Sequence, residues 1–293
     1  MAAVAFADIP AAPRELSPGE RALRRLVRRR GAMVGLAFVV FFVALALFAP
    51  WIAPHDPLAT SWGAVRKAPS AAHWFGTDEI GRDVLSRVIW GARASLLAGL
   101  VSVGISLAIG VPVGVIAGYV GGWIDMLISR ITDAMLACPF LVLAIALAAF
   151  LGPSLTNAMI AIGIAATPVF VRLARAQVLA VKVEDYIEAA RAVGNSDWRI
   201  ALRHVFPNIV APVIVQATLA IAAAVIAEAS LSFLGLGQQP PSPSWGSMLN
   251  TAKNYVENAP WMAVWPGASI FLLVLSFNLL GDGLRDALDP RHT

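Results

Sequence analysis

The residues able to do acid–base, nucleophilic or metal chemistry are few and widely spaced in this 293-residue sequence. Its 4 histidines are His55, His73, His204 and His292, and its single cysteine, Cys138, lies in an apolar run. One cysteine excludes an internal disulfide and a multi-cysteine zinc or iron–sulfur site. The sequence also lacks the G-x-x-x-x-G-K-[ST] loop of nucleotide hydrolases. We therefore predict no catalytic residue and no metal ligand, since no His, Cys or Met cluster falls on one apolar segment.

One polar segment, residues 188–208, has the pattern of two short helices between apolar runs. We expect the first, over about Val183–Val193, to end at Gly194, because glycine readily adopts the positive φ of a helix C-cap. The second has Asp197 in its first turn, where a carboxylate is favoured, and Pro207 marks its change into the next apolar run. Such a helix pair is suited to bind in a groove of a partner protein and to transmit the partner's movement to the adjoining membrane helix. The alternative is an ordinary amphipathic connector.

Polar side chains within the apolar runs are candidates for lining or gating a translocation path. The set is Glu228, Asn157, Gln216 and Asn278, with Asp133 as a further member. An ionisable group among apolar residues is a functional candidate because burying charge in hydrocarbon is costly. The alternative for Glu228 is a carboxylate that accepts hydrogen bonds from Ser230, Ser232 or a loop. Isolated amides such as Asn157 otherwise serve helix packing.

The composition predicts an all-α integral membrane protein. Hydrophobic residues make up 58% of the chain, charged residues only 14%, and the mean hydropathy is +0.73. Soluble domains contain about 45–50% apolar residues. The net charge of +4 comes from arginines beside apolar segments rather than interleaved with exposed aromatics, so we predict no nucleic-acid partner.

The apolar runs divide the chain into about six predicted membrane-spanning helices. The expected parts are a basic N-terminal arm (1–30), a first span (31–53), a polar loop with an interfacial helix (54–93), a five-helix core (94–285) that includes the polar connection at 181–207, and a tail (286–293). Arginine is concentrated in the arm and in the polar connection. The positive-inside rule therefore places both segments, and both chain termini, in the cytoplasm, and the 54–93 loop outside.

Within the core, small residues predict where helices pack closely, and turn signals predict where helices end. The run at 94–124 is interrupted by Gly104, Gly110, Pro112, Gly114 and Gly118, which would let another helix approach closely. The uncharged stretch 134–171 is too long for one crossing, and the turn signal at 152–154 divides it into a third and a fourth helix. The fifth and sixth spans are expected at about 208–234 and 261–280.

The polar connection resembles a known loop. The order Glu188-Ala189-Ala190, three residues, Gly194 and then Pro207 is similar to the EAA loop of ABC-importer permeases, which docks into ATPase subunits. His204 and Phe206 are mild departures from its common aliphatic residues. Further segments resemble, in order, the C-type permease of dipeptide, oligopeptide and nickel importers: His73–Leu100, Gly118–Leu147, Glu228–Leu249 and Asn278–Arg291. The resemblance covers about residues 31–291.

This resemblance implies a type I ABC importer permease fold in the bacterial inner membrane. It implies a heterodimer with a second, related permease, two ATP-binding cassette subunits, and a periplasmic or lipid-anchored solute-binding protein. ATP and Mg would be bound by the ATPase subunits, and this chain would bind no cofactor. The implied coupling residues are Glu188, Ala189, Ala190, Gly194, Asp197 and Pro207. Dipeptides or oligopeptides are the expected substrates, with nickel chelates, glutathione or another small solute as alternatives.

Two other function classes are weaker. A stand-alone secondary transporter predicts mid-membrane ionisable residues and an inverted repeat, whereas the sequence offers mainly Glu228, off-centre, and no clear repeat. An exporter or a membrane-bound enzyme would need a fused ATPase or an intramembrane His/Asp/Glu cluster, which the scattered histidines do not make.

Overall fold

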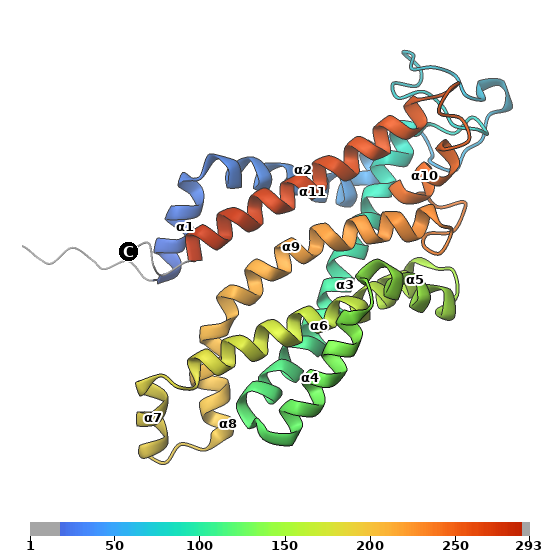
Figure 1. The fold of residues 1–293 in the computed structure, drawn as a ribbon. Coiled ribbons are helices and arrows are strands. Elements are labelled where there is room, and N and C mark those ends of the chain that lie inside the picture. The colour runs from blue at the N-terminus through green and yellow to red at the C-terminus, as the bar shows by residue number, and fades with distance from the viewer. Residues whose placement is uncertain (1–17, 289–293) are drawn as a thin grey trace, which may run out of the picture.

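The computed structural model describes residues 18–288, which fold into a tilted bundle of helices (Figure 1). Hydrocarbon offers no partner for backbone N–H and C=O groups, so a chain this apolar satisfies them within helices. No extended strand forms in residues 18–288, where one isolated bridge joins Thr77 to Asp83. Residues 1–17 of the predicted arm and 289–293 of the predicted tail lie outside the described residues.

The helices, in chain order, are α1 (Pro18–Arg28), α2 (Arg30–Ile52), α3 (Val84–Val120), α4 (Gly122–Ala137), α5 (Phe140–Leu151), α6 (Leu155–Val181), α7 (Asp185–Ala192), α8 (Asp197–Ile200), α9 (Phe206–Phe233), α10 (Trp245–Ala252) and α11 (Trp261–Leu288). A 3₁₀ turn spans Trp62–Ala64 and a π-helical segment spans Ala201–Val205. Within the described chain, 5 helices are long and apolar enough to cross a membrane, and α4 with α5 forms a sixth candidate span bent by 92°. The prediction of about six spans is confirmed.

The second span begins earlier than predicted. Hydropathy placed its start at Ala94, but α3 begins at Val84, because the Asp83 carboxylate caps it by accepting from Ser86 N at 2.8 Å. Arg87 therefore lies inside the helix, where its guanidinium donates to Pro57 O at 2.9 Å. The expected loop at 54–93 thus ends at Asp83, and the 3₁₀ turn is its one helical element among the described residues, in place of the expected interfacial helix.

The uncharged stretch 134–171 divides at the predicted turn, but its helices extend beyond it on both sides. Ser154 caps α6 by accepting from Asn157 N at 3.0 Å, directly after α5 ends. The third span, however, starts at Gly122 in α4 and bends at Cys138–Pro139. The fourth continues past Arg175, whose Nη2 pairs with Asp125 Oδ2 of α4 at 2.7 Å. Paired charges let these helices run past positions where hydropathy alone ends them.

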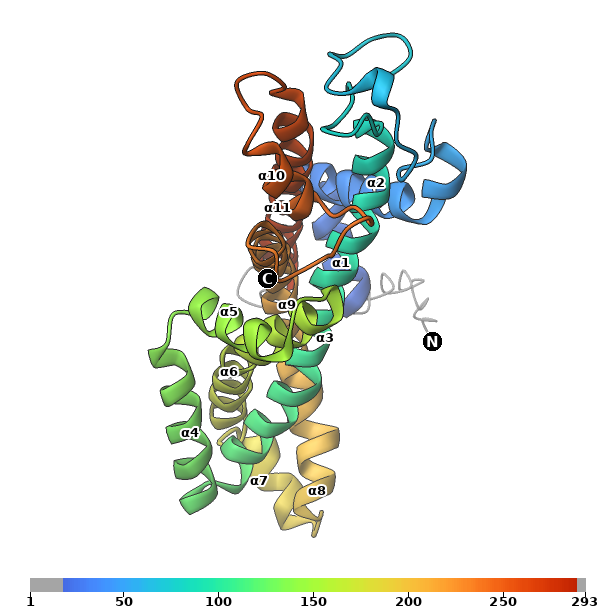
Figure 2. The same ribbon diagram turned by 90° about the vertical axis from the view of Figure 1, so that its right-hand side faces the viewer.

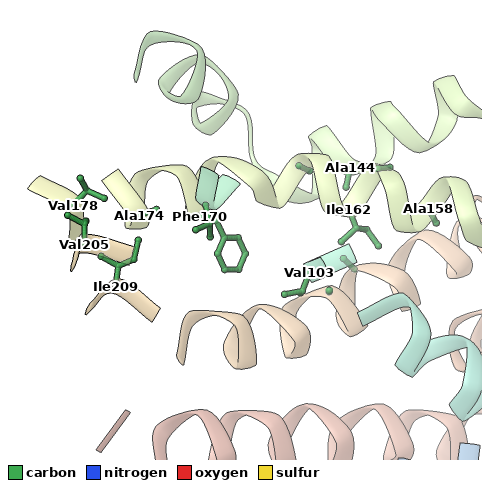
Figure 3. Close-up of a cluster of buried hydrophobic side chains, with 14 of the residues drawn as sticks. Val103, Ala144, Ala158, Ile162, Phe170, Ala174, Val178, Val205 and Ile209 are labelled. Atoms are coloured by element: carbon green, nitrogen blue, oxygen red, sulfur yellow. The ribbon is translucent and has the colours of Figure 1, made fainter. Parts of the chain in front are cut away.

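Helices α3 and α6 make the most extensive packing contact among the described helices. A Cβ placed on Gly114 would lie 2.4 Å from Val171 O, and one on Gly118 would lie 2.9 Å from Arg175 O. Across the same contact, Ser106 Oγ donates to Gly163 O at 2.7 Å. The prediction of close helix approach is confirmed for this seam. Figure 3 shows the apolar cluster beside it, in which Phe170 of α6 is fully buried.

The two ends of the bundle differ in structure (Figure 2). One end carries α7, α8 and the α3–α4 turn, and we call it the α7 end. The opposite end, called the α10 end, carries α10 and the loop at 54–83. There the fully buried Trp245 donates from Nε1 to Val88 O at 2.9 Å and packs edge-on against Phe42 of α2 at 5.5 Å. This contact joins α2, α3 and α10 into one unit.

The glycine seam gives a direct test of the packing. We expect Gly114→Ala to destabilise the folded chain by roughly 1–3 kcal/mol, because the added methyl overlaps the α6 backbone and forces the helices apart. Gly104→Ala is the matched control, since a Cβ there meets no atom within 4 Å. Thermal unfolding of the purified protein in detergent measures both. Equal melting midpoints for the two variants would contradict the assignment of this seam.

Candidate coupling loop and translocation surface

Helix α7 lies at the tip of the bundle, beside α8 (Figure 1). Asp185 and Glu188 lie in its first turn and Arg191 in its last, which is the charge order favoured by the helix dipole. Ile187 and Ala190 are buried against the bundle, whereas Glu188 and Ala189 face outward and are exposed. The helix therefore has an anchored face and a free face.

Gly194 ends α7 as predicted. Its φ is +82°, a left-handed conformation that favours glycine. Gly194 N donates to Arg191 O at 2.9 Å and Asn195 N donates to Ala190 O at 3.2 Å, the bond pair of a Schellman C-cap. The cap turns the chain sharply from α7 into α8.

Helix α8 runs into α9 without a break. Asp197, at the start of α8, is exposed, and the residues from Asp197 to Phe233 form a single candidate span. Pro207 lies in the first turn of α9 and has no N–H to donate, and the π-helical segment just before it widens the helix there. The predicted transition at Pro207 is therefore a local widening of one continuous helix and not a break between two helices. A displacement of α8 would for this reason displace α9 as well.

Two tyrosines attach this loop to the bundle. Tyr119, at the end of α3, donates from its hydroxyl to Asp197 Oδ1 at 2.9 Å, and Asn208 Nδ2 of α9 donates to the Tyr186 hydroxyl of α7 at 3.2 Å. Burial, followed by the charge of Glu184, raises the pKa of Tyr186, so its phenol stays protonated at neutral pH. The sequence did not reveal the Tyr119 contact, because the two partners are 78 positions apart.

The exposed surface of the loop carries apolar side chains among its charged ones. Val183, Val193 and Trp198 are 68%, 79% and 72% exposed. Clustered exposed apolar side chains mark surfaces that a protein or lipid covers. Together with the outward-facing Glu188, they give the loop the features of a docking surface.

Two cavities lie along the inner surface of the bundle. One, of about 290 Å³, is a half-open cavity bordered by α3, α6, α9 and the α4–α5 bend, and it is lined mainly by apolar groups with Ser102 and Gln216. The other, of about 660 Å³, lies between α6, α9 and α11, and Gln177 and Arg285 contribute polar groups to it. Gln216 lines both cavities. It is the predicted path residue that the structure places at their junction.

The other predicted path residues lie apart from Gln216. Asn157 Nδ2 donates to Leu151 O at 2.8 Å and Gly152 O at 3.0 Å, so it closes the α5–α6 turn. Asn278 is half-buried on α11 and lines neither of these two cavities. Asp133 pairs with Arg172 at 2.7 Å on an exposed surface. The structure therefore does not gather the predicted set into one site.

Glu228 is fully buried near the C-terminal end of α9. Its carboxylate accepts from Ser232 Oγ at 2.7 Å and from Ser95 Oγ of α3 at 3.2 Å. Ser232 Oγ in turn accepts from Gln238 N at 3.0 Å in the following loop. The hydrogen bond to Ser232 is the structural alternative weighed from the sequence, and it ties α9 to α3 and to the loop before α10.

The sequence of this chain matches two models of known protein families. Residues 110–293 match the binding-protein-dependent transport system inner membrane component family, and residues 17–69 match the N-terminal TM domain of oligopeptide transport permease C. The chain belongs to this family of inner-membrane transport components. It is accordingly a non-catalytic part of a transport system, as the sequence predicted.

The most similar curated relatives include two dipeptide permeases and a glutathione permease. The dipeptide transport system permease protein DppC of Alkalihalophilus pseudofirmus is 49% identical over 94% of this chain and 91% of the relative. The probable D,D-dipeptide transport system permease protein DdpC of Escherichia coli is 49% identical over 86% of this chain and 85% of the relative. The glutathione transport system permease protein GsiD of Shigella flexneri is 49% identical over 94% and 91%.

A solved structure supports the fold. The inward-facing MetNI methionine ABC transporter matches with a TM-score of 0.56 and 22% identity, over 69% of this chain and 96% of that chain. A second crystal form of the same transporter gives a TM-score of 0.58. The prediction of an ABC importer permease fold is confirmed.

Variants at Glu228 separate a structural role from a gating role. We expect Glu228→Ala to destabilise the protein by about 1–3 kcal/mol, because Ser95 and Ser232 lose their shared buried acceptor. Glu228→Gln retains an acceptor of similar size and should keep most of the stability. Thermal unfolding and substrate uptake are measured together. A Gln variant that unfolds like the wild type but no longer transports would show that the charge itself has a gating role.

Proposed function

We propose that this chain is the C-type permease subunit of an ATP-driven, binding-protein-dependent importer and forms half of its translocation path by alternating access. The observation that carries this proposal is the exposed α7–α8 loop continuous with α9. A partner that draws the loop sideways would displace a whole membrane helix, because α8 and α9 are one continuous span. Family membership supports the transport role.

The proposed partners are assigned to three surfaces: the α7–α8 loop, the apolar flanks of α4 and α11, and the α10 end. Two ATP-binding cassette subunits, carrying ATP and Mg, would supply the push, one of them on Glu188, Ala189 and Gly194 of this chain, while the buried Ala190 anchors the helix to the bundle. The exposed apolar flanks of α4 and α11, such as Trp123 at 70% and Phe271 at 64%, require cover by lipid or by a second, related permease in a heterodimer. A periplasmic or lipid-anchored solute-binding protein would dock at the α10 end.

This orientation puts the α7 end in the cytoplasm of a bacterial cell with an inner membrane. Helices α1, α7 and α8 lie toward that side, and each ends in basic residues, including Arg191 of α7 and Arg199 of α8, which the positive-inside rule favours. Both chain termini would then be cytoplasmic, because an even number of spans returns the chain to its starting side.

We propose dipeptides or short oligopeptides as the substrates, with glutathione, itself a small peptide, as the second candidate. Relatives named for dipeptides, D,D-dipeptides and glutathione support both. The cavity beside Gln216 has mainly apolar walls and few polar groups, which suits passage of varied side chains past an amide that can hydrogen-bond to a peptide backbone.

The coupling proposal is tested by charge reversal on the loop. We expect Glu188→Arg, and separately Gly194→Trp, to abolish binding-protein-stimulated ATP hydrolysis and to weaken co-purification of the ATPase subunits, because each alters the exposed docking surface. Glu257→Arg makes the same charge change on an exposed residue at the α10 end and should leave co-purification intact. If stimulation persists in both loop variants while membrane insertion is normal, the segment is only a connector.

The path proposal is tested at Gln216. In the reconstituted complex, Gln216→Leu should lower uptake of a labelled dipeptide about two- to tenfold, since one backbone-matching hydrogen bond is worth about 0.5–1.5 kcal/mol. Asn278→Leu, which changes an amide outside both cavities, should retain most uptake. Competition by unlabelled glutathione distinguishes the two substrate classes. Equal uptake by the two variants would remove Gln216 from the path.

A further inference from the structure

Three side chains of the metal-ligating kind converge at the α10 end, away from the coupling loop. His55 follows α2, His73 lies in the loop at 54–83, and Asp83 is the N-cap of α3. Nδ1 of His73 is 2.9 Å from Asp83 Oδ1, and Nδ1 of His55 is 3.7 Å from Asp83 Oδ2. One ligand atom from each residue lies within 4.8 Å of the others. The prediction of no metal ligand considered only clusters on single apolar segments, and these residues come from three segments.

The separations match those around a small divalent ion. Ligand atoms about 2.0–2.2 Å from a tetrahedral zinc ion are themselves about 3.3–3.6 Å apart. The two nitrogen–oxygen distances, 2.9 Å and 3.7 Å, bracket this value, and all three ligand atoms lie within 4.8 Å of one another. Both imidazoles present Nδ1 to the same carboxylate, and the two rings are 4.8 Å apart between centroids. Insertion of an ion therefore needs only small side-chain rotations.

A second layer of hydrogen bonds already holds the ligands in place. Asp83 Oδ2 accepts from Ser86 N at 2.8 Å and from Ser86 Oγ at 2.7 Å, which leaves Oδ1 directed at His73. The same Ser86 Oγ accepts from the backbone N of His55 at 3.0 Å. Ser86 thus fixes both the carboxylate and the histidine backbone, the kind of support that orients ligands in metal sites.

We propose that His55, His73 and Asp83 form a binding site for one borderline divalent transition-metal ion of the Zn²⁺ type. Two imidazoles and one carboxylate suit such an ion, whereas Ca²⁺ and Mg²⁺ prefer oxygen ligands alone. The side chain of Asp83 is 2% exposed and that of His55 is 43% exposed, so the site is closed on the α3 side and open to solvent on the other. Water completes the coordination on the open side.

Such an ion would clamp the chain around the outer end of α3. It would join the segment after α2 and the loop at 54–83 to the first turn of α3. Arg87, one turn further, already donates to Pro57 O at 2.9 Å and to Pro241 O at 3.4 Å, so the same helix end also holds the loop before α10. The metal therefore cross-links these three segments at the α10 end, opposite the coupling loop, whatever solute the protein transports.

Metal binding is measured on the full, untagged protein after treatment with EDTA, by equilibrium dialysis against Zn²⁺ with elemental analysis. We expect one tightly held Zn²⁺ per chain in the wild type and at least about a hundredfold weaker binding in the double variant His55→Gln, His73→Gln. His204→Gln, on the π-helical segment before α9, is the matched control and should bind like the wild type. Co²⁺ in place of Zn²⁺ should give visible absorption bands that the double variant lacks.

A single variant guards against misfolding. His55 is largely exposed, so His55→Gln should fold normally and still weaken Zn²⁺ binding about tenfold or more. Zn²⁺ should also raise the melting midpoint of the wild type but not that of the double variant, because a ligand that binds only the folded state stabilises it. Absence of stoichiometric Zn²⁺ in the wild type, or equal binding by the double variant and the His204→Gln control, overturns the proposal.

Discussion

The direct backbone contact between α3 and α6 is the constraint on which the rest of the structure depends. Glycines at 110, 114 and 118 leave no room for a side chain between the two helices. In a membrane, where lipid competes equally for apolar surface, such close approach and the hydrogen bonds it allows hold helices together. Because α3 spans the whole bundle, its two ends then position the two functional surfaces. Asp83 and Val88 organise the α10 end, and Tyr119 reaches Asp197 at the α7 end.

Helix α9 complements this fixed pair as the element suited to move. It begins in the coupling loop, passes Gln216 at the junction of two cavities and ends at the buried Glu228. A continuous helix transmits displacement along its length, since its internal hydrogen bonds resist bending more than its side-chain contacts resist sliding. The same helix therefore links the proposed docking surface for ATPase subunits, the proposed path at Gln216 and the hydrogen-bond network of Glu228.

Charged residues within the bundle form ion pairs, which lower the cost of placing their charges in or near a membrane. Arg175 of α6 meets Asp125 of α4, and at the outer end Arg82 meets Asp78 at 2.6 Å. Burial, followed by the neighbouring Asp78, raises the pKa of Glu79, which accepts from Arg82 at 2.6 Å in the same cluster. These pairs let helices extend past arginines and let the 54–83 loop fold as an ordered cap on α3.

The sequence by itself determined the membrane class, the span count, the turn at 152–154, the C-cap at Gly194 and the likeness to importer permeases. The likeness rests on resemblance of motifs, whereas each of the other features depends on local chemistry, such as hydropathy, turn propensity or the backbone freedom of glycine, that neighbours along the chain settle. Hydropathy missed the start of α3 at Val84 and the bend at Pro139, although local features set both, namely the Asp83 cap and the Cys138–Pro139 break. Only the tertiary structure decided the Tyr119–Asp197 contact and the meeting of His55, His73 and Asp83. These features join residues far apart in the chain. Their partners are set by how the helices pack, which local sequence pattern does not encode.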